Sequence, residues 1–220
     1  RTKFDIHCVG VTGSVGKTTT KDMIAAVLSS GFQTLKTQGN LNNEIGLPAT
    51  LFGLDASYQA AVVEMGMQGP GEIAALARIA QPQIGVITNI GVSHIEQLGS
   101  RENILQAKLE LAQALPNGAP LIVCGDDDLL CRVDIPRLKI IRYGLDNPAC
   151  TVRAQDIVEN STATTFTLVY DKDYCPVRIP TLGRHNVRNA LAAFAVGRAL
   201  GISAEQCAQA LGEYVPSGMR

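Results

Sequence analysis

Apolar runs of strand length alternate with segments of helical periodicity through the first two-thirds of the chain. Residues 17–30 show the helical pattern, because their apolar residues from Met23 to Leu28 recur three and four positions apart. Short continuous apolar runs, which are typical of buried strands, flank this segment on both sides. The segments predicted as strands are 4–11, 33–36, 60–64, 84–88, 121–124 and 139–143, and the further predicted helices are 72–80 and 101–115.

This alternation predicts an α/β fold, with a mostly parallel sheet, helices on both faces and right-handed crossovers. The pattern changes after residue 150, where Thr, Val and Tyr become frequent and alternate with polar positions, which predicts a small antiparallel sheet. Two Ala-rich helical segments follow. We therefore expect a three-layer parallel core at about 1–150, an antiparallel sheet at 151–180, C-terminal helices at 181–213 and the start of a linker at 214–220.

Composition and charge exclude several classes of protein. The 220 residues are 46% hydrophobic, which suits a globular domain with a substantial core. A net charge of −1 gives no basic field for nucleic acid, and no apolar run approaches the ~18 residues of a membrane span. Because the chain lacks an initiator Met, we expect a piece of a longer protein.

The number and spacing of the cysteines indicate the redox compartment of the protein. There are six, at Cys8, Cys124, Cys131, Cys150, Cys175 and Cys207. None forms a CxxC pair, and the first two lie in apolar runs where a thiol behaves as a small hydrophobe. We interpret them as reduced thiols of a cytoplasmic protein; the alternatives are a zinc site or a disulfide framework.

A glycine-rich turn lies between the first predicted strand and the first predicted helix. It consists of Gly13, Ser14, Val15, Gly16, Lys17 and Thr18, and Thr19 follows it. Glycines let backbone N–H groups converge on phosphate oxygens, and the helix that begins there adds its positive dipole end. Lys17 can reach the β- and γ-phosphates, and the Thr18 hydroxyl can bind Mg²⁺. The general P-loop spacing puts a glycine where Val11 stands, so the alternative is an ordinary turn with an incidental lysine.

Two polar side chains follow predicted strands, where ligands of open parallel sheets collect. Glu64 ends the strand at 60–64 and is a candidate to hold Mg²⁺ or its water; the alternative is a solvated loop residue. His94 comes six residues after the strand at 84–88, and the alternative there is a surface histidine. Lys108 lies within a predicted helix, where the residue pattern alone favours a solvated lysine. The side chains of the Asn-rich loop at 40–44 could bind a ligand or water, or could only stabilise turns.

Taken together, these motifs resemble the Mur ligase family of ATP-dependent ligases, which add amino acids to the peptidoglycan precursor. The resemblance covers nearly the whole chain and rests on TQGNLNNEIGLP at 37–48, EMGM at 64–67, TNIGVSHIE at 88–96 and GRHNVRNALAA at 183–193. The family's phosphate loop, G-[TS]-x-G-K-[TS], is shorter than the general one, which accounts for Val11. The first three stretches are most similar to family members that join D-Ala-D-Ala to UDP-N-acetylmuramoyl-tripeptide.

The resemblance implies a set of site residues. ATP would lie along the phosphate loop, with Asn43 near the γ-phosphate and with Asn186 and Asn189 facing adenine. Two metal ions are implied, of which Thr18 and Glu64 would hold Mg²⁺ between the β- and γ-phosphates and His94 would hold the second. Lys108 matches a lysine that carries a CO₂-derived carbamate in several members, and a carbamate would make it a metal ligand. The expected catalytic residues are then Lys17, His94 and Lys108.

The resemblance also implies a reaction and missing domains. The tripeptide carboxylate would be phosphorylated by ATP, and the D-Ala-D-Ala amine would displace phosphate from the acyl phosphate. Whole members have three domains and this chain resembles the central one, so we expect the N- and C-terminal domains to be absent and this piece to be inactive alone. Two alternatives stay open: another ligase of the same architecture, similar to folylpolyglutamate synthase, and a nucleotide-binding module without ligase activity.

Overall fold

A nine-stranded sheet runs through the computed structural model, which describes residues 3–171 and 173–216. The strand order is β2-β3-β1-β4-β5-β6-β7-β8-β9. The strands are β1 (His7–Thr12), β2 (Thr34–Lys36), β3 (Ala60–Glu64), β4 (Ile84–Ile87), β5 (Pro120–Cys124), β6 (Lys139–Gly144), β7 (Val152–Glu159), β8 (Thr164–Tyr170) and β9 (Asp173–Ile179). Strands β1 to β6 pair in parallel, which confirms the predicted fold class.

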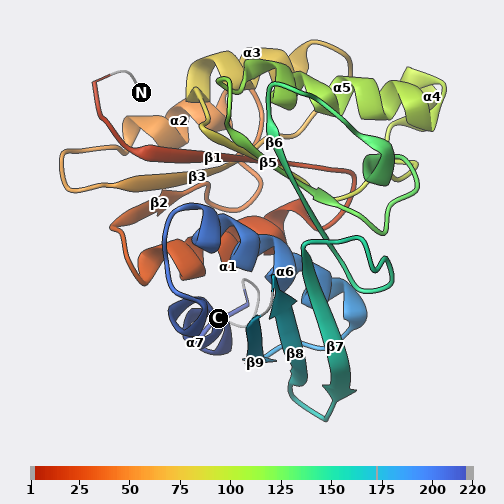
Figure 1. The fold of residues 1–220 in the computed structure, drawn as a ribbon. Coiled ribbons are helices and arrows are strands. Elements are labelled where there is room, and N and C mark those ends of the chain that lie inside the picture. The colour runs from red at the N-terminus through yellow and green to blue at the C-terminus, as the bar shows by residue number, and fades with distance from the viewer. Residues whose placement is uncertain (1–2, 172, 217–220) are drawn as a thin grey trace.

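Helices cover both faces of the parallel strands. The helices are α1 (Lys17–Ser29), α2 (Gly46–Phe52), α3 (Glu72–Ala80), α4 (Ile95–Leu98), α5 (Arg101–Ala114), the 3-10 turn η1 (Leu130–Arg132), α6 (Arg184–Ala199) and α7 (Ala204–Gly212). Helices α2, α3 and α5 lie on one face, and α1, α6 and α7 lie on the other (Figure 1). Every residue of β3 and β4 is buried, because a parallel strand between two helical layers faces no solvent.

The C-terminal strands form a continuation of the parallel sheet. Strand β7 pairs in parallel with the end of β6, at Tyr143 with Val152 and Gly144 with Arg153, and then turns antiparallel against β8. The antiparallel strands predicted at 151–180 therefore belong to the same nine-stranded sheet, joined to it by this two-residue pairing. Apolar side chains such as Val152, Phe166 and Leu168 are buried and belong to the same hydrophobic core.

Most predicted elements differ from the structure by one to three residues at an end. The first strand begins at His7 instead of residue 4, and α5 ends at Ala114. Helix α7 begins after Ser203, whose side chain and that of Gln206 form a reciprocal capping box. The expected linker at 214–220 lies partly outside the described residues, which end at residue 216. None of the six cysteines forms a disulfide within the described residues, and no helix there is long and apolar enough to cross a membrane.

Candidate nucleotide-binding site

The glycine-rich loop links the end of β1 to the start of α1. Gly16 precedes α1 with a φ of 80°, and Gly13 has a φ of 147°, both conformations that favour glycine. A Cβ atom on Gly13 would collide with Thr88 Oγ1, so the loop packs directly on the end of β4. This close packing requires a glycine at position 13.

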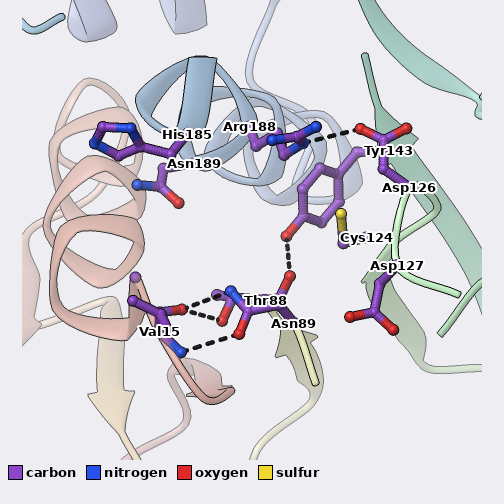
Figure 2. Close-up of a pocket in the computed structure, with 11 residues that line it drawn as sticks. Val15, Thr88, Asn89, Cys124, Asp126, Asp127, Tyr143, His185, Arg188 and Asn189 are labelled. Carbon is purple, nitrogen blue, oxygen red and sulfur yellow. Dashed lines mark hydrogen bonds and ion pairs between the residues drawn. The ribbon is translucent and has the colours of Figure 1, made fainter. Parts of the chain in front are cut away.

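Residues after β4 hold the loop in place. Asn89 Oδ1 accepts a hydrogen bond from Val15 N at 3.0 Å, and Asn89 Nδ2 donates one to Val15 O at 3.0 Å (Figure 2). Thr88 Oγ1 donates to the same carbonyl at 2.7 Å, and the Asn89 carbonyl accepts from Ser14 N at 3.1 Å. The Ser14 hydroxyl accepts from Gly91 N at 2.9 Å. The loop is thus fixed from outside by Thr88 and Asn89, whose role the sequence reading missed although they lie at a strand end.

Lys17 folds back over the loop at the first position of α1. Its Nζ donates to the carbonyls of Gly13 at 3.0 Å and Ser14 at 3.3 Å. Burial lowers the pKa of Lys17, and the Glu64 carboxylate opposes that shift. Thr18 and Thr19 lie half-buried in the same turn of the helix. A cation held above the loop is what phosphate binding needs.

Glu64 is buried at the end of β3, with 1% of its surface exposed, so it is not a solvated loop residue. Its Oε1 accepts a hydrogen bond from Asn42 Nδ2 at 2.7 Å, and its Oε2 lies 3.9 Å from Lys21 Nζ. No hydrogen-bond donor among the described residues reaches Oε2. Because buried polar atoms nearly always have a hydrogen-bond partner, an oxygen whose one close cation is Lys21 at 3.9 Å is a candidate ligand atom.

Lys108 is also buried, with 2% of its surface exposed, so the solvated lysine favoured by the residue pattern is wrong. Burial, together with the nearby charge of Lys17, lowers the pKa of Lys108 from 10.5 to about 7. No hydrogen bond or ion pair joins Lys108 to another residue within the described part of the chain. An amine with this pKa is about half neutral near pH 7, and the neutral fraction is nucleophilic.

A cavity of about 350 Å³, here called the Lys17 cavity, gathers several of the predicted residues. Its walls are formed by Lys17, Asn42, Asn43, Glu44, Gly66, Met67, Gln68, Glu72 and His94. His94 is exposed and adopts a φ of 67° just before α4, which places it at the cavity rim rather than in the core. Asn43 Oδ1 accepts from the N–H groups of Ile45 and Gly46, so the Asn-rich loop serves turn chemistry as well as lining the cavity.

The donor set near this cavity suits a hard cation. No group of three or more His, Cys, Asp and Glu residues lies together in the described segments, 3–171 and 173–216. A protein-only cage of the zinc type is therefore not formed there. Mg²⁺ is usually held by one or two protein oxygens, phosphate oxygens and water, and the unpaired Oε2 of Glu64 matches that demand.

A second cavity, of about 400 Å³ and here called the Arg188 cavity, lies on the α6 side of the loop (Figure 2). It is lined by Val15, Gly16, Thr88, Asn89, Cys124, Asp126, Asp127, Tyr143, His185, Arg188 and Asn189. Asn189 accepts a hydrogen bond from Thr20 at 3.1 Å and donates to Asn186 Oδ1 at 3.3 Å. Asn186 does not line the cavity; it donates to the Leu182 carbonyl and holds Asn189 in place.

Asp126 organises the far wall of the Arg188 cavity. It accepts hydrogen bonds from the backbone N–H groups of residues 145, 146 and 147, and from Arg188 Nε at 2.9 Å. Burial tends to raise the pKa of Asp126, but these hydrogen bonds outweigh it and lower that pKa. Sequence reasoning missed Asp126, although it follows β5 as Glu64 ends β3, so the strand-end rule applied there too would have found it.

Residues 11–197 match the family described as the Mur ligase middle domain. The chain belongs to this family. This Mur ligase middle domain is 45% identical to the UDP-N-acetylmuramoyl-tripeptide–D-alanyl-D-alanine ligase of Bacillus subtilis, over 96% of the chain and 45% of the relative. It is 37% identical to the ligase of the same name from Escherichia coli, over 91% of the chain and 45% of the relative.

Solved structures agree with these sequence matches. A crystal structure of MurF from Acinetobacter baumannii superposes with a TM-score of 0.91 at 34% identity, over 97% of this chain and 47% of that one. MurF ligase from Thermotoga maritima in complex with ADP gives 0.89 at 28% identity, over 98% and 50%. The Mur ligase middle domain therefore spans about half the length of the relatives it matches.

The fold is shared with a structure of much lower sequence identity. A folylpolyglutamate synthase mutant of L. casei superposes with a TM-score of 0.75 at 16% identity, over 96% of this chain and 64% of that one. At that identity the likeness shows the fold alone.

Proposed function

We propose that this chain is the nucleotide-binding part of an ATP-dependent ligase that joins D-Ala-D-Ala to UDP-N-acetylmuramoyl-tripeptide in peptidoglycan precursor synthesis. The relatives of that name, matched over nearly the whole chain, support this substrate pair. The observation that carries the proposal is the Lys17 cavity, where a phosphate-loop lysine lies near the buried carboxylate Glu64, which has an unpaired oxygen. The carboxylate alone fits any protein that binds a nucleotide with Mg²⁺, and the names of the relatives favour a ligase over a nucleotide-binding module.

In the proposed binding mode, ATP lies across both cavities. The N–H groups of the loop 13–19 and the Lys17 ammonium hold the phosphates, and Asn43 lies near the γ-phosphate. The nucleoside occupies the Arg188 cavity, with Asn189 against adenine and Asn186 acting through Asn189. The MurF structure from Thermotoga maritima, which contains ADP, supports a nucleotide site in this fold.

We assign the metal ligands as follows. Thr18 and Glu64 would hold Mg²⁺, and His94 at the cavity rim would hold a second ion. Such cations would neutralise negative charge at the phosphoryl group. Lys17 Nζ, which lies against the loop carbonyls, would donate to the phosphate oxygens, so charge that develops during transfer would meet a fixed cation.

The chemistry proceeds in two displacements. The tripeptide carboxylate oxygen forms a bond to the γ-phosphorus while the bond to the β-phosphate oxygen breaks, which gives an acyl phosphate and ADP. The amine of D-Ala-D-Ala then attacks the acyl carbon, and inorganic phosphate leaves as the amide forms. A carboxylate repels nucleophiles through its negative charge, so phosphorylation is needed to provide a leaving group.

Lys108 enters this scheme as a carbamate. Its pKa of about 7 leaves part of the amine unprotonated and able to attack CO₂. The buried amine has no partner within the described residues, whereas the carbamate anion would be stabilised by nearby cations. The modification would convert a buried amine into an anionic metal ligand. The nearby positive charge of Lys17 would attract the carbamate anion. Carbon-13 NMR after exposure to labelled bicarbonate, with Lys108→Met as control, should show one carbamate signal that the variant lacks.

We further propose that residues 1–220 are the middle of three domains in a cytoplasmic enzyme. Coverage of about 45% of the Bacillus subtilis and Escherichia coli relatives supports further domains, and six cysteines without a disulfide among the described residues suit a reducing compartment. The N-terminal domain would bind the UDP-sugar and the C-terminal domain the dipeptide. The 220-residue chain alone should then bind ATP weakly and ligate little or nothing.

The direct test gives the full-length protein ATP, UDP-N-acetylmuramoyl-tripeptide and D-Ala-D-Ala. We expect phosphate and amide in equal amounts, dependent on the dipeptide. Folate with glutamate serves as the competing substrate pair, because the fold is shared with folylpolyglutamate synthase. Phosphate release only with folate and glutamate, or none with either pair, would contradict the proposal.

A further inference from the structure

Lys21 is a buried lysine that none of the steps above uses. It lies on α1 one turn after Lys17, and only 1% of its surface is exposed. Its Nζ donates to the carbonyl of Thr37 at 2.8 Å and to that of Gly39 at 3.3 Å. The helix that begins at the phosphate loop is thereby tied to the start of the Asn-rich loop.

Two carboxylates surround the Lys21 ammonium. Asp22 Oδ1 lies at 3.5 Å, and Glu64 Oε2 lies at 3.9 Å. Asp22 also forms an ion pair with Lys36 at 2.7 Å, so its charge is shared between two lysines. The 3.9 Å between Lys21 Nζ and Glu64 Oε2 is longer than a hydrogen bond, so Lys21 attracts this oxygen without occupying its lone pairs.

The rest of the Glu64 residue is fixed by the same frame. Asn42 Nδ2 donates to Oε1 at 2.7 Å, and the Glu64 backbone N–H donates to Thr37 Oγ1 at 3.1 Å. Thr37 thus receives a hydrogen bond from Lys21 at its carbonyl and one from Glu64 at its hydroxyl. The carboxylate is oriented from α1 on one side and from the Asn-rich loop on the other.

We propose that Lys21 is a positioning residue, which holds the Glu64 carboxylate in register with the phosphate loop so that Oε2 presents itself to the divalent cation that accompanies the nucleotide. This inference rests on the proposed function, since it takes Glu64 as a ligand. Groups that orient a metal ligand from behind commonly change metal affinity without touching the metal. Lys21 has the required place, because it contacts Glu64, Thr37 and the loop after β2 but does not line the Lys17 cavity.

The test measures nucleotide affinity of the full-length protein as a function of Mg²⁺, and needs no turnover. In Lys21→Met, the Mg²⁺ concentration that half-saturates ATP binding should rise on the order of tenfold. ATP affinity in EDTA should stay within about twofold of the wild type, since the phosphate loop is intact. Lys21→Arg keeps the charge and should recover most of the Mg²⁺ response. Lys36→Met, which removes the other lysine of the cluster, is the matched control and should leave the Mg²⁺ response unchanged.

A merely structural role predicts a different result. If Lys21→Met weakens ATP binding equally with and without Mg²⁺, or leaves both unchanged, the inference is overturned. Should Lys21→Met fail to fold, Lys21→Gln and Lys21→Arg decide in its place. A Mg²⁺ response lost in the Gln variant and kept in the Arg variant supports the positioning role, and an equal response in both overturns it.

A double-mutant cycle separates this inference from the proposed function. Glu64→Gln alone should raise the Mg²⁺ requirement, and adding Lys21→Met to it should cause little further change, because the two act through one carboxylate. Fully additive effects would overturn the positioning role while leaving Glu64 as a ligand. No effect of Glu64→Gln on the Mg²⁺ requirement would overturn the metal assignment and the inference together.

Discussion

The two cavities that meet at the phosphate loop differ in how their charged groups are satisfied. In the Arg188 cavity, Asp126 accepts four hydrogen bonds, three of them from backbone N–H groups. Near the Lys17 cavity, Glu64 Oε2 has no hydrogen-bond donor and Lys108 has no partner within the described residues. A satisfied network stabilises the fold, whereas buried groups left unpaired lower its stability unless a ligand meets them.

This contrast suggests that one side provides a rigid wall and the other provides chemistry. Substitutions in the Arg188 cavity should then act mainly on stability or nucleoside affinity. Those near the Lys17 cavity should act mainly on turnover and can even stabilise the fold.

The largest expected effect is that of Lys17→Ala. Turnover of the full-length protein should fall by about 10³-fold, because the fixed cation at the transferred phosphate is lost. Phosphate release under saturating substrates measures this. Lys139→Ala, at an exposed position on β6, is the control and should keep full activity. A loss of less than tenfold for Lys17→Ala would contradict the proposed contact between Lys17 and the transferred phosphate.

Asp126→Ala should lower the free energy of unfolding by about 3 kcal/mol, because it leaves several backbone N–H groups and Arg188 unpaired. Urea unfolding at pH 7 measures the change. Since hydrogen bonding lowers the pKa of Asp126, its contribution is present above the ordinary carboxyl range and is lost as the pH falls through the lowered value. Glu64→Gln is the matching substitution near the Lys17 cavity and should lower the free energy of unfolding less. A loss as large as that of Asp126→Ala would contradict the difference between the two cavities.

Lys108→Met should change the pH dependence of stability. The pKa of about 7 in the folded protein lies below 10.5, so between these values the unfolded chain binds more protons and stability rises with pH. For the wild type in CO₂-free buffer we expect a gain of about 2 kcal/mol between about pH 7.5 and 9 from this group. The variant should lack that rise and be more stable at pH 7. Equal pH slopes in the two proteins would show that Lys108 is not buried as an amine.

The smallest effect expected is that of Asn189→Ala. ATP affinity should weaken by about fivefold to tenfold, as for one lost hydrogen bond near the base. Binding of inorganic tripolyphosphate should stay unchanged, because it does not reach the Arg188 cavity. Asn186→Ala should weaken ATP binding less, since Asn186 acts through Asn189. Calorimetric titration with both ligands distinguishes these outcomes, and equal losses for the two ligands would contradict the assignment.

The sequence alone determined the α/β alternation, the phosphate loop and its place between β1 and α1. These features are local, because hydrophobic periodicity and glycine spacing act within a few residues. It also indicated Glu64 and His94, since the ends of parallel strands meet at one edge of a sheet. Strand ends shifted by a few residues, because hydrogen bonding to neighbours decides where a strand begins.

Only the tertiary structure decided which polar groups are buried and with whom. Lys21 and Lys108 look like ordinary helical lysines in the sequence, and packing against distant segments made both of them interior. Asn42, Asn89 and Asp126 gained their roles from partners 19 to 74 residues away. The energy of a charge depends on its burial and on the groups around it, and neither can be read from a single segment of chain.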